Sequence, residues 1–190
     1  MTFSVNSAIS IAWETVALIW AVGLLFTKRT VRSLPGGVRL FHLVLIGLGF
    51  SLVGARWFEV GWLGERFIPA SQELGAIGLG LTVVGCLFAI WARLALGGNW
   101  SGRATVKANH ELITRGPYAL TRHPIYTGLM TAVVGTMLAR GEWRCVLGAV
   151  LILVTFLVKM GQEERLMMQT FPQAYPEYRR NVKALIPGVF

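Results

Sequence analysis

Long apolar stretches with almost no charge dominate this sequence and restrict the folds that it can adopt. They lie at about residues 7–26, 40–55, 74–92, 124–139 and 145–158. An α-helix needs about 20 residues to cross a bilayer, and the first and third stretches reach that length. The other three cross only if the Trp and Arg residues beside them reach the membrane interfaces. The pattern predicts an all-α, polytopic membrane helix bundle with about five transmembrane helices, or four if one short stretch does not cross.

The composition supports a membrane protein and gives the net charge a simple explanation. Only 14% of the residues are charged and none is aspartate, whereas soluble domains carry about 25% charged residues. A net charge of +9 would suggest nucleic-acid binding in a soluble chain. Here the basic residues are better explained by membrane topology and by attraction to anionic headgroups. We expect membrane lipids, and no nucleic acid, as partners of the basic surface.

The basic residues lie mainly in alternate connections between the apolar stretches. Fourteen of the 18 fall between the first and second stretches, between the third and fourth, or after the fifth. The other connections hold Arg56, Arg66, Arg140 and Arg144. The positive-inside rule then puts the N-terminus outside and the C-terminus in the cytoplasm. We expect a multi-pass protein of a prokaryotic inner membrane, because a chain this short is typical of prokaryotes.

Polarity changes sharply after the fifth stretch. Lys159, Gln162 and Glu163 follow it with no proline among them, so we expect the helix to continue into the cytoplasm as a polar extension. Pro172 and Pro176 should end that helix.

The chain shows no internal repeat and is expected to form a single domain over residues 1–190. Residues 1–96 would form a three-helix membrane part, and residues 97–190 a cofactor-binding part with a helical hairpin and a tail. The hairpin is predicted at Arg140-Gly141-Glu142, which is all that separates the fourth stretch from the fifth.

A compact polar cluster precedes the fourth stretch. It contains Gly116-Pro117-Tyr118 and then Arg122-His123-Pro124. Proline suits the first turn of a helix, so a helix should begin at Pro124. The free N–H groups and positive dipole end of that helix would lie beside Arg122 and His123 and form an anion site.

A second polar group lies on the extension of the fifth helix. Lys159 and Glu163 are four residues apart and share a helix face. A hairpin would bring this pair close to Arg122, His123 and Tyr126. A surface salt bridge that contributes little is the alternative interpretation of the pair.

The sequence lacks the residue patterns of a metal site, a catalytic triad and a phosphate-binding loop. His110 and His123 stand thirteen residues apart, and Cys86 and Cys145 lie within apolar stretches, so no metal site is predicted. No Ser-His-acid arrangement and no phosphate-binding loop is present. The remaining donors and aromatic rings suit a zwitterionic ligand with a carboxylate and a cationic group.

At these residues the chain resembles the isoprenylcysteine carboxyl methyltransferase family of integral-membrane enzymes that use S-adenosyl-L-methionine. The resemblance covers residues 99–187 and rests on an ordered set of motifs rather than on any single one. They are His110-Glu111-Leu112-Ile113, Gly116-x-Tyr118, Arg122-His123-Pro124-x-Tyr126-x-Gly128, Glu163-Glu164 and Tyr175-x-x-Tyr178.

The resemblance implies which residues contact the cofactor and which contact the methyl acceptor. The implied cofactor residues are His110, Glu111, Leu112, Ile113, Tyr118, His123, Pro124, Ile125, Tyr126 and Glu163. Lys159 stands where eukaryotic members have an arginine at the methyl-accepting end. Lysine keeps the charge but loses the bidentate grip on a carboxylate. Lys159 or Arg122 would hold the acceptor carboxylate, and these two are the catalytic candidates.

The activity that the resemblance implies is carboxyl O-methylation of a lipidated or amphiphilic acceptor, such as an isoprenylcysteine-like compound. A phospholipid amine N-methyltransferase, whose C-terminal motifs look similar, is the first alternative. An NADPH-dependent enzyme of the sterol-reductase type and a non-enzymatic membrane protein are more distant alternatives.

Overall fold

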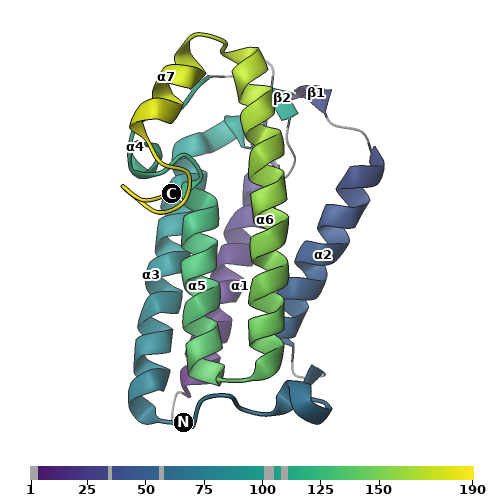
Figure 1. The fold of residues 1–190 in the computed structure, drawn as a ribbon, viewed down its shortest axis with the longest axis vertical. Coiled ribbons are helices and arrows are strands. Elements are labelled where there is room, and N and C mark those ends of the chain that lie inside the picture. The colour runs from purple at the N-terminus through teal and green to yellow at the C-terminus, as the bar shows by residue number, and fades with distance from the viewer. Residues whose placement is uncertain (1–3, 34–35, 56–57, 101–104, 108–110) are drawn as a thin grey trace.

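Within the described residues, five long helices form the body of the protein and alternate in direction (Figure 1). The computed structural model describes residues 4–33, 36–55, 58–100, 105–107 and 111–190. The long helices are α1 (Val5–Leu24), α2 (Gly36–Gly54), α3 (Gln72–Leu96), α5 (Pro124–Arg140) and α6 (Trp143–Thr170). Each predicted apolar stretch therefore forms a helix, and the all-α bundle is confirmed. Among the described helices, α1, α3 and α6 are long and apolar enough to cross a membrane.

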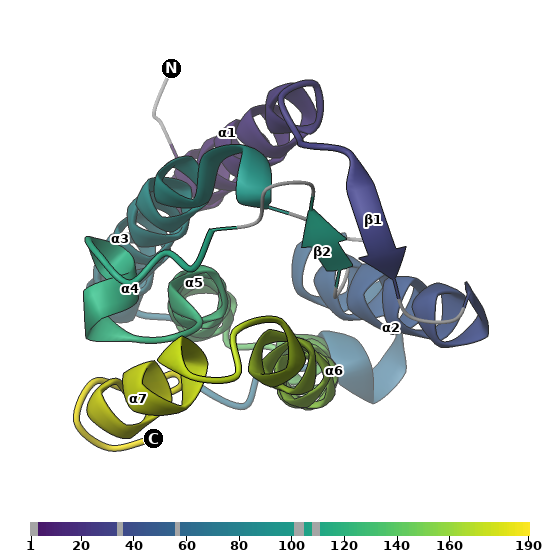
Figure 2. The same cartoon turned by 90° about the horizontal axis from the view of Figure 1, so that it is seen from above.

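A small antiparallel ribbon, which was not predicted, joins two loops at one end of the bundle. Strand β1 (Thr30–Ser33) pairs with β2 (Thr105–Lys107). The short helices α4 (Pro117–Leu120) and α7 (Ala174–Asn181) lie at the same end (Figures 1 and 2). We call this the ribbon end. The opposite, hairpin end holds the α5–α6 turn and the 3₁₀ turn η2 (Gly61–Gly64).

Glycines let α3 and α5 pack backbone against backbone. A Cβ on Gly78 would lie 2.5 Å from the Gly135 carbonyl oxygen, and one on Gly85 would lie 2.5 Å from that of Gly128. Small residues allow this close approach between helices in lipid, where packing rather than hydrophobic burial drives association. Close backbone packing is thus present at Gly78 and Gly85 of α3. Among the described residues, and leaving aside the backbone of its own helix, nothing lies within 4 Å of a Cβ on Gly80.

This packing predicts opposite results for two glycines of the same helix. Gly85→Ala should lower the free energy of unfolding by about 1–3 kcal/mol, since its methyl group must force apart two helix backbones. Gly80→Ala should be neutral or slightly stabilising, because alanine favours a helix by about 1 kcal/mol. Thermal unfolding in detergent measures both. Equal stability of the two variants would contradict the packing.

The α5–α6 hairpin is as tight as predicted. Gly141 follows α5 with φ of 66°, a left-handed conformation that favours glycine, and its N–H donates to the Met137 carbonyl over 2.7 Å. Glu142 then occupies the N-cap position of α6 in an extended conformation. The short turn fixes α5 and α6 as antiparallel neighbours.

Helix α2 is fixed to the bundle at the hairpin end. The Arg144 guanidinium is fully buried and donates to the carbonyls of Leu52 and Ala55 over 2.8 and 2.9 Å. Arg140 donates to the Gly54 carbonyl over 3.0 Å. Toward the ribbon end α2 leans away from α6 (Figure 1). There Leu40 and Leu43 are 67% and 57% exposed, so only one half of α2 is firmly held.

The predicted polar extension is present, because α6 continues without a break to Thr170. The expected tail holds one more helix than the sequence suggested. Pro176 does not end a helix but lies in the first turn of α7, where a proline costs no hydrogen bond. The chain after α7 returns to the N-terminus of α5.

Candidate functional site

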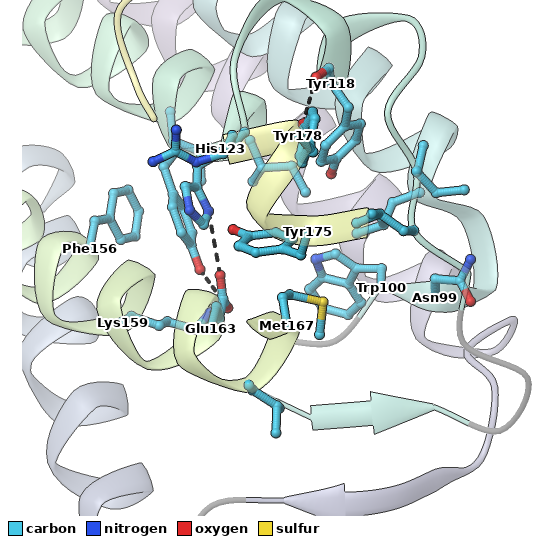
Figure 3. Close-up of a pocket in the computed structure, with 18 of the residues that line it drawn as sticks. Asn99, Trp100, Tyr118, His123, Phe156, Lys159, Glu163, Met167, Tyr175 and Tyr178 are labelled. Carbon is cyan, nitrogen blue, oxygen red and sulfur yellow. Dashed lines mark hydrogen bonds and ion pairs between the residues drawn. The ribbon is translucent and has the colours of Figure 1, made fainter. Parts of the chain in front are cut away.

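A cavity of about 410 Å³ lies at the ribbon end, in the size range of small-ligand sites (Figure 3). Polar and aromatic side chains of α5, α6, α7 and the segment before α5 line much of it. The rest of its wall is apolar and includes Trp20 of α1 and Leu43, Ile46 and Phe50 of α2. The cavity therefore joins a polar chamber to an apolar wall built from the first two helices.

Glu163 is the centre of the polar chamber. Its carboxylate accepts a hydrogen bond from the Tyr126 hydroxyl over 2.9 Å and lies 3.5 Å from the Lys159 ammonium. The ring of His123 places Nδ1 3.7 Å from the same carboxylate. The Lys159 side chain is 12% exposed, so this pair is more than the surface salt bridge that the sequence left open.

Aromatic rings stack beside this charge cluster. The Tyr126 ring lies between His123, at a centroid distance of 5.6 Å, and Phe156, at 4.5 Å. The Lys159 ammonium lies 5.3 Å from the Tyr126 centroid. The stack leads from the polar chamber to the apolar wall and places one cation at the junction.

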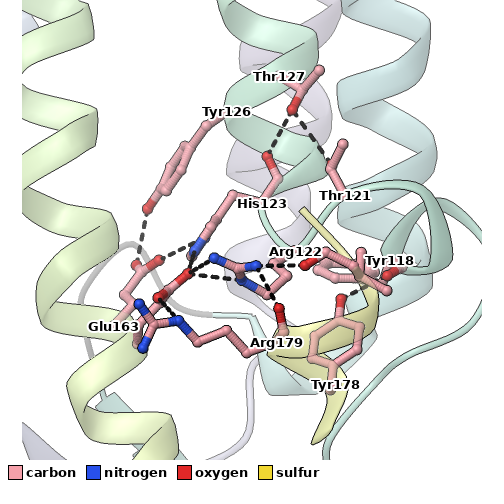
Figure 4. Close-up of polar contacts among 11 residues, drawn as sticks. Tyr118, Thr121, Arg122, His123, Tyr126, Thr127, Glu163, Tyr178 and Arg179 are labelled. Carbon is pink, nitrogen blue, oxygen red and sulfur yellow. Dashed lines mark hydrogen bonds and ion pairs between the residues drawn. The ribbon is translucent and has the colours of Figure 1, made fainter. Parts of the chain in front are cut away.

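The neighbouring carboxylate, that of Glu164, binds two arginines instead of lysine. Its carboxylate lies 2.8 Å from Arg122 Nη2, 3.3 Å from Arg179 Nε and 3.3 Å from His123 Nε2. The Arg122 side chain is only 9% exposed, and it also donates to the carbonyls of Arg179 and Val182 (Figure 4). Arg122 is therefore occupied in joining α6 to the tail.

Backbone hydrogen bonds complete this junction. The N–H groups of Arg122 and His123 donate to the carbonyls of Lys183 and Ala184 over 2.8 and 3.0 Å. The Tyr178 hydroxyl donates to the Tyr118 carbonyl over 2.6 Å. Burial raises the pKa of Tyr118 and Tyr178, so both phenols stay protonated. The tail thus forms a wall of the cavity rather than a loose end.

Glu164→Gln should loosen the tail and lower the free energy of unfolding by about 2 kcal/mol, because Arg122 loses the carboxylate that balances its buried charge. Thermal unfolding and limited proteolysis of residues 171–190 measure the two effects. Glu177→Gln, which changes an exposed glutamate of α7, is the matched control. Equal proteolysis of both variants would contradict this role.

The structure brings most of the predicted site residues to one cavity. The lining includes Glu111, Leu112, Ile113, Tyr118, His123, Ile125, Tyr126 and Glu163, together with both catalytic candidates, Arg122 and Lys159. Pro124 is buried at the start of α5, as predicted, and is not part of the lining. His110 lies outside the described residues. The cofactor and catalytic roles of these residues stay predictions.

Some lining residues were not predicted. Asn99 and Trp100 follow α3, and Lys28 donates to the Asn99 side chain over 2.9 Å. The Arg93 guanidinium stacks on the Trp100 ring at 4.4 Å. A tryptophan beside Gly97-Gly98 was the only signal in the sequence. Within the described part of the chain, no three His, Cys, Asp or Glu side chains group as a metal site.

The fold and the cavity define a membrane-embedded helical protein with a polar ligand chamber at one end of its bundle. The model of the isoprenylcysteine carboxyl methyltransferase (ICMT) family matches residues 77–169, which include α5 and most of α3 and α6. Over these residues, just under half of the chain, the chain is similar to this family.

Similar proteins come from bacteria and eukaryotes. The cobalt-zinc-cadmium resistance protein CzcN of Cupriavidus metallidurans is 31% identical over 73% of this chain and 59% of its own length. Protein-S-isoprenylcysteine O-methyltransferase of Tribolium castaneum is 29% identical over 70% of this chain and 49% of its own length. The chain therefore spans about half to three-fifths of these relatives.

A solved structure shows the same fold. It is that of the eukaryotic intramembrane Ras methyltransferase ICMT, with a TM-score of 0.51 and 22% sequence identity. The similarity covers 80% of this chain and 51% of that one.

Proposed function

We propose that this protein is a membrane methyltransferase that uses S-adenosyl-L-methionine to methylate the carboxylate of a lipidated or amphiphilic acceptor. The observation that carries the proposal is the single cavity in which the Glu163 cluster meets an apolar wall from α1 and α2. A water-soluble donor and a lipid-like acceptor could meet there. Protein-S-isoprenylcysteine O-methyltransferases among the relatives support an isoprenylcysteine-like acceptor.

The polar chamber suits the chemistry of the proposed cofactor. Glu163 offers a carboxylate for an ammonium or for ribose hydroxyls, and Tyr118 and Trp100 offer aromatic surface for a base. The Tyr126 hydroxyl, which donates to Glu163, would help to hold that carboxylate toward the cofactor. When bound, S-adenosyl-L-methionine supplies a methyl group on a cationic sulfur that a carboxylate oxygen accepts directly.

The chain's own residues then need to align the acceptor and exclude water. Lys159 is the best candidate to hold the acceptor carboxylate, because its ammonium lies where the polar chamber meets the apolar wall. Arg122 acts by positioning, because Glu164 and the tail occupy its guanidinium. The stacked rings of Tyr126 and Phe156 keep the junction dry, which strengthens the charge interactions there.

An amine acceptor fits this site less well. A protonated amine must lose a proton before it can be methylated, which calls for a general base. Each ring nitrogen of His123 lies beside a carboxylate, Glu163 or Glu164. Both ring nitrogens are therefore engaged by side chains of the protein, and neither is free to face an acceptor amine. A carboxylate acceptor needs no such base.

We further propose that all five long helices cross the membrane, with the ribbon end in the cytoplasm of a prokaryotic cell. The alternating helix directions and the basic residues of the ribbon-end connections support this orientation. In this arrangement residues 1–96 supply the apolar wall and residues 97–190 supply most of the polar chamber.

Labelled S-adenosylmethionine tests the proposed function. Membranes that contain the protein should transfer the labelled methyl group to N-acetyl-S-farnesylcysteine, and mild base should release the label as methanol. Membranes without the protein are the control. Label that resists base and stays in phospholipid would favour amine N-methylation instead. Thermal protection by NADPH, and none by S-adenosylhomocysteine, would favour a reductase.

A further inference from the structure

The apolar part of the cavity lies between two helices that meet at one level and separate toward the ribbon end. Trp13 of α1 and Phe50 of α2 are in contact, with ring centroids 5.4 Å apart and planes at 70°. Seven residues nearer the ribbon end on each helix are Trp20 and Leu43, which both line the cavity. Seven helical residues rise about 10 Å, so Trp20 on α1 and Leu43 on α2 lie at similar heights above the contact between Trp13 and Phe50.

Phe50 closes the base of this space. Along α2 the lining residues Leu43, Ile46 and Phe50 share one face, and Phe50 is the one nearest the hairpin end. Trp13 lies behind it and is not part of the lining. Gly49, next to Phe50, sits against Ile152 so closely that a Cβ would approach to 2.7 Å. Phe50 thus belongs to the half of α2 that is firmly held.

A chain of buried hydrogen bonds fixes Trp13. The indole N–H donates to the Thr136 hydroxyl over 3.0 Å, and that hydroxyl lies 3.2 Å from the Thr82 hydroxyl. Thr136 donates its one proton to the Ala132 carbonyl over 2.9 Å, and Thr82 can donate its proton to the Thr136 hydroxyl or to the Gly78 carbonyl, 2.8 Å away. Turning the indole aside would leave its N–H unpaired in an apolar region. The support behind Phe50 is therefore rigid.

We infer that Phe50, backed by Trp13, is the floor of the site for the acceptor's apolar chain and sets the chain length that fits. The inference rests on the proposed function, because the acceptor's carboxylate is taken to lie at Lys159. An apolar chain gains little by moving from lipid into an equally apolar cavity. Selection between acceptors must then come from the space available, and a chain longer than the distance to the floor has to bend aside between α1 and α2.

A series of acceptors of increasing length tests the floor. N-acetylcysteine carrying a geranyl, farnesyl or geranylgeranyl thioether is offered to the protein in nanodiscs. Binding is measured with S-adenosylhomocysteine present, and kcat/KM for methyl transfer is measured separately. Phe50→Ala should raise the ratio of geranylgeranyl to geranyl kcat/KM by about tenfold, as expected when a pocket gains or loses a small apolar group. The ratio of affinities should move in the same direction.

Two further variants keep the result interpretable. Trp13→Phe retains an aromatic ring, removes the anchored N–H and should shift both ratios the same way by a smaller factor. Phe88→Ala removes a ring that packs on Trp91 outside the cavity, and it should leave both ratios unchanged. Unchanged ratios in both Phe50→Ala and Trp13→Phe, with every compound bound, would overturn the floor. Failure of the wild type to bind any of the compounds would instead overturn the proposed function, and this inference with it.

Discussion

Lys159→Ala is expected to reduce methyl transfer by roughly 100- to 1,000-fold while leaving the affinity for S-adenosylhomocysteine nearly unchanged. The Lys159 ammonium is nearly buried, 3.5 Å from Glu163 and over the Tyr126 ring. It is one helical turn from Phe156, which lines the same cavity. Among the described lining residues the other Arg or Lys is Arg122, which Glu164 and the tail engage, so without Lys159 none is left to hold an acceptor carboxylate in line. Single-turnover methylation and calorimetric titration measure the two quantities.

A charge-conserving variant and a control variant test this expectation. Lys159→Arg keeps the positive charge and should recover most of the activity, since arginine can grip a carboxylate with two donors. Lys183→Ala removes an exposed charge at the same end of the bundle and should retain full activity. A collapse of cofactor affinity in Lys159→Ala would show that the division between donor and acceptor parts of the cavity is wrong.

Glu163→Gln is expected to weaken S-adenosylhomocysteine binding by roughly 10- to 100-fold, because a hydrogen bond to a charged group contributes about 1.5–3 kcal/mol. The substitution keeps the size of the side chain and an acceptor for the Tyr126 hydroxyl. It removes the charge that faces Lys159 and the proposed ammonium group. Calorimetric titration of the purified protein measures the loss.

The neighbouring glutamate supplies a sharp contrast. Glu164→Gln should mainly lower stability through Arg122 and the tail, whereas Glu163→Gln should mainly lower ligand affinity. Unchanged affinity in Glu163→Gln would remove this residue from the cofactor site. A similar fall in unfolding temperature for both variants would mean that the two carboxylates do not have separate roles.

The helices were predictable because apolar length and helix-end residues are local signals. Proline at position 124 and glycine at position 141 mark the ends of α5, and both act where the sequence places them. The ribbon was not predictable in the same way. Its strands are three and four residues long, too short for alternation to show, and their pairing depends on two loops that lie far apart in the sequence.

The site was predicted only in part, for geometric reasons. Consecutive helical residues point about 100° apart, so Glu163 and Glu164 could not both face the cavity. The helix face that Glu163 shares with Lys159, together with the family resemblance, favoured Glu163. The pairing of Arg122 with Glu164 depends on how the tail returns. The roles of Trp13 and Phe50 could not be predicted for another reason. An apolar residue beside a cavity has the same sequence pattern as one in the core.

Because α1 and α2 diverge toward the ribbon end, the proposed enzyme should take its acceptor from one leaflet of the membrane and not from the other. In the proposed orientation, the apolar wall opens to the cytoplasmic leaflet, and Trp13 with Phe50 closes it toward the other leaflet. An acceptor inserted from the outside would have to flip across the bilayer before it could be methylated. In sealed vesicles, the delay before methylation of an acceptor added on that side would then report the rate of transbilayer movement.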